Sequence, residues 1–207
     1  MFRLPPFLAV NLFMEVIDGI IALLIGYFAF KGYRTIKDRV FLYLHFSFIL
    51  LGVGFLAHGF TTGLASTRPL RFAVPLLNFG YLIYFLSELA AYSLLIYAYL
   101  QQTRILASSS LSPAAFAAFP FLIEYNPVSE VIIFCLTAFI TAQCAVNYSV
   151  KRKRSLLLVL VGFTLITLSH VLFPLARAAG ILFLTAHILQ LAGFASLLAM
   201  LLKVSKG

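Results

Sequence analysis

VFLYLHFSFILLGVGFLAHGFT, residues 40–61, is a run of 22 residues without a single charged side chain. A helix needs roughly 20 mainly apolar residues to cross the hydrocarbon core of a bilayer, so this run is long enough to span it. The whole chain agrees, because 63% of its 207 residues are hydrophobic and only 10% are charged. Such a composition lies outside the range of soluble domains and predicts an all-α integral membrane protein.

Apolar runs of this kind recur along the chain and leave only short connections between them. We therefore expect a single domain over residues 1–207, folded as a seven-transmembrane-helix bundle. The segment 105–125 contains several serines and two prolines, and would also suit a broken or re-entrant helix. The expected spans are 7–30, 40–61, 72–100, 105–125, 129–150, 155–176 and 180–202.

The basic residues are divided unequally between the two sides of this bundle. With the N-terminus outside and the C-terminus inside, eleven basic residues face the cytoplasm and four face outward. Cytoplasmic loops carry an excess of Lys and Arg, so this split favours a multi-pass protein of the cell membrane with seven crossings. The net charge of +9 thus reflects topology and contact with lipid headgroups, and we expect no nucleic-acid partner. The inner set is Lys31, Arg34, Lys37, Arg39, Arg104, Lys151, Arg152, Lys153, Arg154, Lys203 and Lys206, and the outer set is Arg3, Arg68, Arg71 and Arg177, beside Glu124 and Glu130.

All four histidines fall inside apolar runs, where a polar side chain costs free energy unless it pairs, binds a ligand or lines a cavity. At about 1.5 Å per residue, His58, His170 and His187 lie at similar depths near the outer ends of three different helices. His45 lies in the opposite leaflet, and we expect it to make an ordinary hydrogen bond to a neighbouring helix. Three imidazoles at one depth predict a site that binds haem or a metal ion between helices.

The most specific function that these residues suggest is electron transfer by a small b-type cytochrome-like protein, with a quinol or a redox protein as partner. His170 and His187 are the expected ligands of haem b, since they lie on adjacent antiparallel helices. His58 would be a third ligand or a hydrogen-bonding neighbour. The arginines that would hold the haem propionates are Arg68, Arg71 and Arg177.

Two polar stripes lie on helices that otherwise are apolar. Asn11, Glu15 and Asp18 share one face of the first helix, which we expect to line the same cavity as the outer histidines. The stripe could form a proton path, a set of metal ligands or a polar seam between helices. On the third helix, Glu88 lies near the middle of the bilayer on a face with Tyr81, Tyr84 and Tyr92, where a lone charge would be costly.

Other functions remain open at this point. Zn²⁺ held by His58, His170 and His187 with Glu15 or Asp18 would support a membrane hydrolase, with Gln190 orienting His187 or a water molecule. A non-enzymatic seven-helix sensor, a transporter or a membrane subunit of a larger complex is a further alternative.

One internal similarity bears on this choice. Residues 89–95 (LAAYSLL) resemble residues 192–198 (AGFASLL), which indicates either a distant duplication or a chance match between apolar helices.

Overall fold

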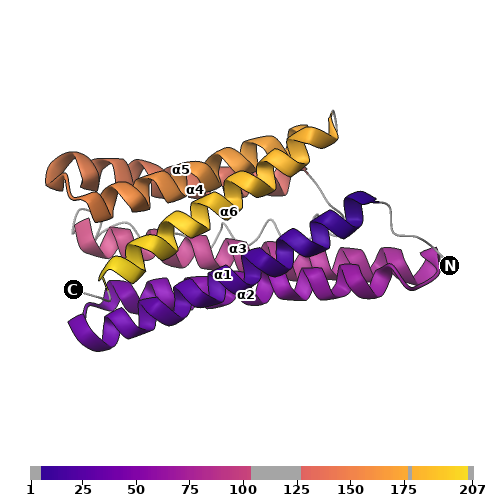
Figure 1. Ribbon diagram of the computed structural model, residues 1–207, viewed down its shortest axis with the longest axis horizontal. Coiled ribbons are helices and arrows are strands. Elements are labelled where there is room, and N and C mark those ends of the chain that lie inside the picture. The colour runs from indigo at the N-terminus through magenta and orange to yellow at the C-terminus, as the bar shows by residue number, and fades with distance from the viewer. Residues whose placement is uncertain (1–5, 104–126, 177–178, 205–207) are drawn as a thin grey trace.

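The computed structural model describes residues 6–103, 127–176 and 179–204, and the regular structure in these ranges is entirely helical. Each of the six described helices is long and apolar enough to cross a membrane (Figure 1). The chain is thus an all-helical, multi-pass membrane protein by length and composition, while the span expected at 105–125 lies outside the described residues. The helices are α1 (Pro6–Ile36), α2 (Arg39–Ala65), α3 (Leu70–Thr103), α4 (Pro127–Lys151), α5 (Arg154–Leu175) and α6 (Gly180–Val204).

Several helices extend beyond the apolar runs that predicted them. The first was expected to end at residue 30, and α1 continues to Ile36 through Lys31 and Arg34. Lys and Arg are good helix formers, and their long side chains can reach the polar interface while the stems stay on apolar surface. The start of α2 is fixed by Asp38, whose carboxylate accepts a hydrogen bond from the backbone N–H of Val40 at 3.0 Å.

The helices pack in a closed ring. Each contacts its neighbours in the chain order, and α6 packs against α1 to complete the circle. In Figure 1 α1, α2 and α3 lie on one side and α4 and α5 on the other, while α6 crosses obliquely from the α5 side toward α1. In chain order the ring consists of two three-helix halves, α1–α3 and α4–α6. We call these the first half and the second half.

The third and fourth helices run in the same direction. The Tyr81 hydroxyl, near the start of α3, hydrogen-bonds Ser129 near the start of α4. The Tyr99 hydroxyl, near the end of α3, contacts the Cys144 sulfur in the second part of α4 at 3.1 Å. Consequently α3 ends and α4 begins at opposite ends of the bundle. The first helix of each half therefore runs in the same direction, and so do the second and the third.

The hairpins that join the first two helices of each half have the same turn. Lys37 and Arg152 are the residues with positive φ that are not glycine in the described chain, at 60° and 46°. Each follows a helix, and its backbone N–H donates to a tyrosine carbonyl four residues earlier at 2.8 Å, from Tyr33 or Tyr148. In each hairpin, one residue with a left-handed backbone conformation thus ends the first helix and turns the chain back.

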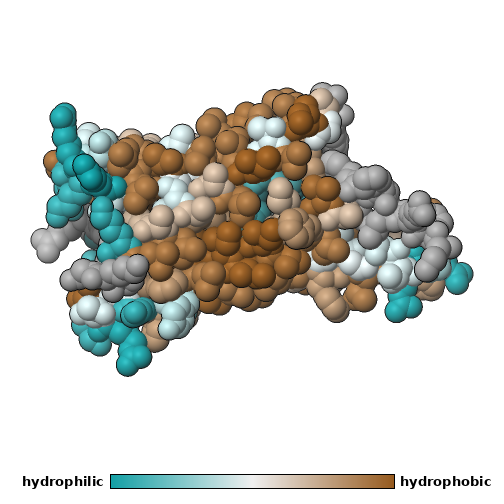
Figure 2. All heavy atoms as spheres, viewed as in Figure 1, coloured by the Kyte–Doolittle hydropathy of each residue, from teal (hydrophilic) through white to brown (hydrophobic). Residues whose placement is uncertain are grey.

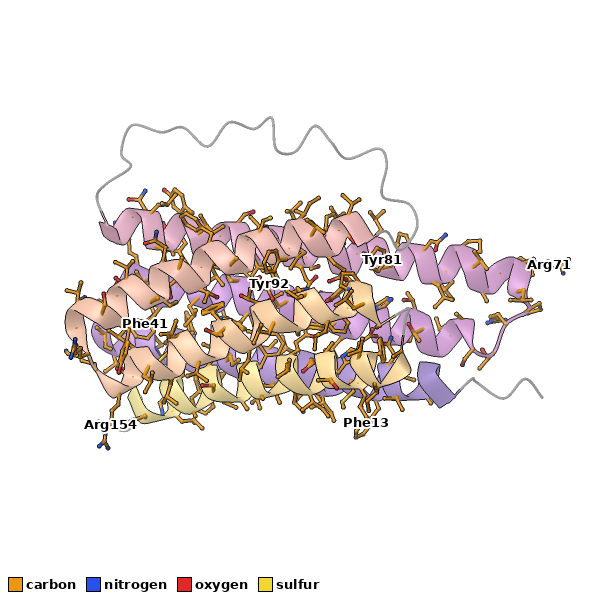
Figure 3. All side chains as sticks on the ribbon, turned by 90° about the horizontal axis from the view of Figure 1, so that it is seen from above. Phe13, Phe41, Arg71, Tyr81, Tyr92 and Arg154 are labelled. Atoms are coloured by element: carbon orange, nitrogen blue, oxygen red, sulfur yellow. The ribbon has the colours of Figure 1, made fainter. Side chains whose placement is uncertain are left out.

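Charge marks the two ends of the bundle. One end, which we call the basic end, carries both hairpin turns, and Figure 3 shows Arg154 there and Arg71 at the opposite end. In Figure 2 a hydrophobic belt separates the polar ends, as expected for a surface that faces lipid. Phe13 belongs to this belt and points away from the bundle in Figure 3. The described basic residues at the basic end are Lys31, Arg34, Lys37, Arg39, Lys151, Arg152, Lys153, Arg154 and Lys203.

Two features hold the middle of the bundle together. The rings of Phe48, Phe55 and Phe194, which we call the aromatic layer, meet edge to face, with Phe194 6.0 Å from Phe48 and 5.8 Å from Phe55. All three are fully buried. Glycines allow the α5–α6 pair to pack closely, because a Cβ at Gly193 would lie 2.7 Å from the carbonyl oxygen of Gly162.

Candidate functional site

Four of the six acidic residues in the sequence are buried between the helices. Glu15, Asp18, Glu88 and Glu130 are each at most 5% exposed. A buried carboxylate without a partner costs several kcal/mol in proteins, about the amount lost when a buried ion pair is broken. The contacts of these four side chains therefore define the candidate site.

In the first half, Glu15 of α1 pairs with His58 of α2. His58 Nδ1 lies 2.7 Å from Glu15 Oε1, and the amide of Asn11 donates to the same oxygen at 2.6 Å. The His58 ring stacks on Tyr84 of α3, with centroids 5.5 Å apart and an angle of 22° between the ring planes. All three helices of the first half thus fix the position of His58.

In the second half, Glu130 of α4 pairs with His170 of α5. The two side chains meet through His170 Nδ1 and Glu130 Oε2 at 2.9 Å. On its other side, His170 Nε2 lies 3.8 Å from Glu88 Oε1, which belongs to α3 of the first half. His170 is therefore placed between two carboxylates, and one of them crosses from the other half.

His187 of α6 contacts the first half as well. Its Nε2 lies 3.1 Å from the side-chain oxygen of Asn11, and its Nδ1 lies 4.0 Å from Asp18 Oδ2. Because Asn11 also donates to Glu15, one amide connects His187 to the Glu15–His58 pair. We call the set of four carboxylates and three histidines the carboxylate–histidine cluster; its members are Glu15, Asp18, His58, Glu88, Glu130, His170 and His187.

Several polar atoms in and beside the cluster have no hydrogen-bond partner among the described residues. An unsatisfied buried polar atom costs about 1–3 kcal/mol, so groups of them require water or a polar ligand. Gln190 is fully buried one turn after His187, and both of its amide atoms are of this kind. Tyr92 also carries such an atom, its hydroxyl oxygen, and Figure 3 shows this residue nearer than Tyr81 to the middle of the length of the bundle. The other such atoms in and beside the cluster are Glu15 Oε2, both oxygens of Asp18, His58 Nδ1, Glu88 Oε1, His170 Nε2 and His187 Nδ1. The 2.7 Å contact between His58 and Glu15 is therefore a close ion-pair contact, whereas His170 and Glu130 share an aligned hydrogen bond.

The two Glu–His pairs occupy equivalent places in the two halves. The residues Glu-Val-Ile occur at 15–17 in α1 and again at 130–132 in α4. From each glutamate, 22 residues lead to the left-handed residue of its hairpin, Lys37 or Arg152. The histidine then follows on the second helix of the hairpin, 21 residues after Lys37 in the first half and 18 residues after Arg152 in the second. The repeat is thus exact for the acid and the turn, and the positions of the histidines differ by about one helical turn.

The structure brings together several residues that the sequence singled out. We predicted that Glu15 and Asp18 share a cavity with the outer histidines. In the structure Glu15 Oε1 lies 2.7 Å from His58 Nδ1, and Asp18 Oδ2 lies 4.0 Å from His187 Nδ1. The expected haem ligands His170 and His187 lie on neighbouring helices. The ring of Phe173 contacts both of them, at centroid distances of 5.9 and 5.0 Å.

The arginines proposed for the haem propionates do not join this group. Arg68 and Arg71 are exposed, and Arg71 lies at the far tip of α3 in Figure 3, where it contacts Phe72. Ten residues of helix separate it from Tyr81, which corresponds to about 15 Å along the axis. Arg177 lies outside the described residues.

One member of the cluster was missed in the sequence analysis. Glu130 was counted only among the residues of the outer side and was given no part in the site. In the structure it is buried and paired with His170. The Glu-Val-Ile repeat was the signal in the sequence that could have identified it.

His45 stays apart from the cluster. Its Nδ1 lies 2.9 Å from the backbone oxygen of Gly26 in α1, so a helix backbone satisfies it, as the sequence analysis expected.

Within the described ranges, no three His, Cys, Asp or Glu side chains are arranged to hold a metal ion. The zinc site considered from the sequence gains no support from these side chains. Comparison of the chain with protein families, with curated proteins and with solved structures finds no match.

Proposed function

We propose that this protein carries protons through the membrane, and that the two buried Glu–His pairs are its proton-binding sites. The observation that carries the proposal is the repetition of the pair, Glu15–His58 in one half and Glu130–His170 in the other, with contacts of 2.7 and 2.9 Å. Ionisable residues inside a membrane mark ion and proton pathways, and chains of acids and histidines form proton relays. Transporters built from two parallel repeats also bind their ions where the repeats meet.

Each pair can pass a proton without leaving a lone charge in the bilayer. A proton that moves from the carboxylic acid to the imidazole converts a neutral pair into a carboxylate and an imidazolium in contact. Glu88 lies 3.8 Å from His170 and connects the second pair to the middle of the bundle. The unpartnered atoms of Asp18, Tyr92 and Gln190 offer positions for water along this path.

Proton flux into liposomes tests the proposal. The purified chain is reconstituted with a pH-sensitive dye inside, and a pH gradient is imposed with potassium and valinomycin to balance charge. We expect acidification faster than in protein-free liposomes, and a loss of about tenfold or more in Glu15→Gln and in Glu130→Gln, because glutamine keeps the shape and removes the proton site.

Two histidines on the same helix supply the matched control. We expect His58→Gln to reduce the flux strongly and His45→Gln to leave it unchanged, since the contacts of His45 are with a backbone oxygen of α1 and with the rings of Phe30 and Phe46. Wild-type liposomes that acidify no faster than empty ones would refute proton transport. Equal flux in all variants would place the path elsewhere.

For the topology, we propose seven crossings with the N-terminus outside and the C-terminus inside. The parallel course of α3 and α4 supports an odd number of crossings, because the chain between them must return from one end of the bundle to the other. The concentration of Lys and Arg at the basic end supports its cytoplasmic placement. Cysteine introduced at Arg152 should resist an impermeant maleimide in intact cells, and cysteine at Arg71 should react. The reverse labelling would invert the topology.

Haem-based electron transfer remains a second candidate, favoured by one contact. His170 Nδ1 contacts Glu130, and its Nε2 has no hydrogen-bond partner among the described residues. In a metal-bound histidine, one ring nitrogen usually binds the metal and the other hydrogen-bonds a carboxylate or a backbone carbonyl. Phe173 would have to move for His187 to bind the same iron. A visible spectrum of the purified protein with and without dithionite tests this candidate, because reducible haem bands would support it and their absence would exclude it.

A further inference from the structure

A cavity of about 240 Å³ lies inside the bundle near the basic end, separate from the carboxylate–histidine cluster. All six helices contribute to its wall, so it lies within the ring. No member of the cluster lines it. Its volume is below the range of about 300–1,000 Å³ that is typical of sites for drug-sized ligands, and suits a narrow molecule better than a bulky one.

The wall changes from apolar to polar along the cavity. Its inner part is formed by fully buried side chains, among them Ile25, Phe48 and Phe163. Phe48 belongs to the aromatic layer, which separates the cavity from the cluster. Toward the basic end the lining residues are more exposed and become polar, with Asn147, Ser155 and Lys151. An occupant would therefore have an apolar tail and a polar head.

The charges at the mouth determine the sign of that head. Asp38 and Lys151 both line the mouth, and the Asp38 carboxylate, which caps α2 through the N–H of Val40, is outnumbered by the basic residues 151–154. Within the described chain Lys151 forms no ion pair with Asp38, and Arg152, Lys153 and Arg154 follow it directly. The mouth therefore presents positive charge to an incoming head group.

We propose that this cavity binds a medium-chain fatty acid, with its carboxylate at Lys151 and its chain extending toward Phe48 and Phe163. A carboxylate can accept charge-assisted hydrogen bonds from Lys151, with Ser155 beside it. A single chain fits the volume and the apolar wall, whereas a phospholipid brings two chains. The inference is independent of the proposed proton transport.

Photolabelling tests the site in the full-length protein reconstituted in nanodiscs. A fatty acid with a diazirine in mid-chain is bound and irradiated, and the labelled residues are mapped by mass spectrometry. We expect label on residues of the cavity wall such as Phe48, Val159 and Met200. Label confined to side chains of the lipid-facing surface, such as Phe46 and Val53, would overturn the proposal.

Competition by unlabelled fatty acid measures the affinity. Lys151→Gln should weaken binding about tenfold through loss of the charged contact. Lys153→Gln is the matched control, because Lys153 is exposed, does not line the cavity and makes no side-chain hydrogen bond to cap α5. Equal weakening by both variants would show attraction to surface charge only. A fatty alcohol or a phospholipid probe that competes as well as the fatty acid would refute the carboxylate assignment.

Discussion

The two halves of the bundle share their first two helices and differ in the third. In both, a glutamate near the start of the first helix meets a histidine on the second, and a turn through a left-handed basic residue joins these helices. The third helices have diverged, because α3 supplies Glu88 and α6 supplies His187. The repeat therefore preserves the pair, while the residues that bridge the halves are specific to each half.

The two pairs also differ in their surroundings. The side chain of His58 is 15% exposed, whereas that of His170 is completely buried. Glu15 is supported by the amide of Asn11, and His170 is approached by the second carboxylate of Glu88. The same pair of residue types thus occurs once in a more open site and once in a sealed one, which allows the cost of burial to be measured within one molecule.

The largest effect is expected from removing the acid of the sealed pair. Glu130→Ala should lower the free energy of unfolding by about 3–5 kcal/mol, because it leaves His170 buried beside Glu88 without its main partner. Glu15→Ala should cost less, since His58 is partly exposed and still stacks on Tyr84. Unfolding in mixed micelles, titrated with sodium dodecyl sulfate, measures both. A larger loss in Glu15→Ala would reverse the comparison.

Close packing of the helix pairs gives the next effect. Gly193→Ala should destabilise the protein by about 1–3 kcal/mol, because its Cβ would lie 2.7 Å from the backbone oxygen of Gly162, which cannot rotate away. Gly63→Ala is the control in the other half, where the nearest atom would be at 3.8 Å. The same unfolding titration applies. Equal stability of the two variants would show that α5 and α6 can separate without cost.

The contact between Glu88 and His170, which connects the two halves, should be measurable as a coupling energy. We expect Glu88→Gln and His170→Gln to be coupled by about 1 kcal/mol in a double-mutant cycle of unfolding free energies. Glu88→Gln and His58→Gln should be nearly additive, because the ion-pair partner of His58 is Glu15 in its own half. Coupling to both histidines would mean that the pairs act as one network.

How far the sequence predicted the molecule depends on the range of the interaction. Long apolar runs are a local property, and they predicted all six described helices with shifts at the ends. Matched depth along the helices also predicted that His58, His170 and His187 lie in one part of the bundle, where Asn11 connects His187 to the Glu15–His58 pair and Phe173 contacts both His170 and His187. The depth of a residue does not tell which face of its helix points toward which neighbour. The pairing of His170 with Glu130 therefore could not be derived from depth.

The cavity at the basic end could not be predicted from the sequence for the same reason. Its wall combines side chains from six helices, each of which is unremarkable in its own apolar run. The repeat was only partly detected, through 89–95 and 192–198, since apolar helices resemble one another by composition. The short Glu-Val-Ile match gained meaning only when both glutamates were found beside histidines.

The smallest effect concerns the histidine that belongs to neither pair. His45 lies on the same helix as His58 and bonds the backbone oxygen of Gly26 at 2.9 Å, so it serves as an internal reference for a histidine with a structural role. Hydrogen bonds between membrane helices contribute about 0.6 kcal/mol on average, and His45→Ala should cost about this much in unfolding free energy. It should leave proton flux unchanged, because no carboxylate of the cluster contacts it. A loss of flux comparable to that of His58→Gln would mean that the path continues past the aromatic layer along α2, and the two histidines would then have to be treated as successive sites.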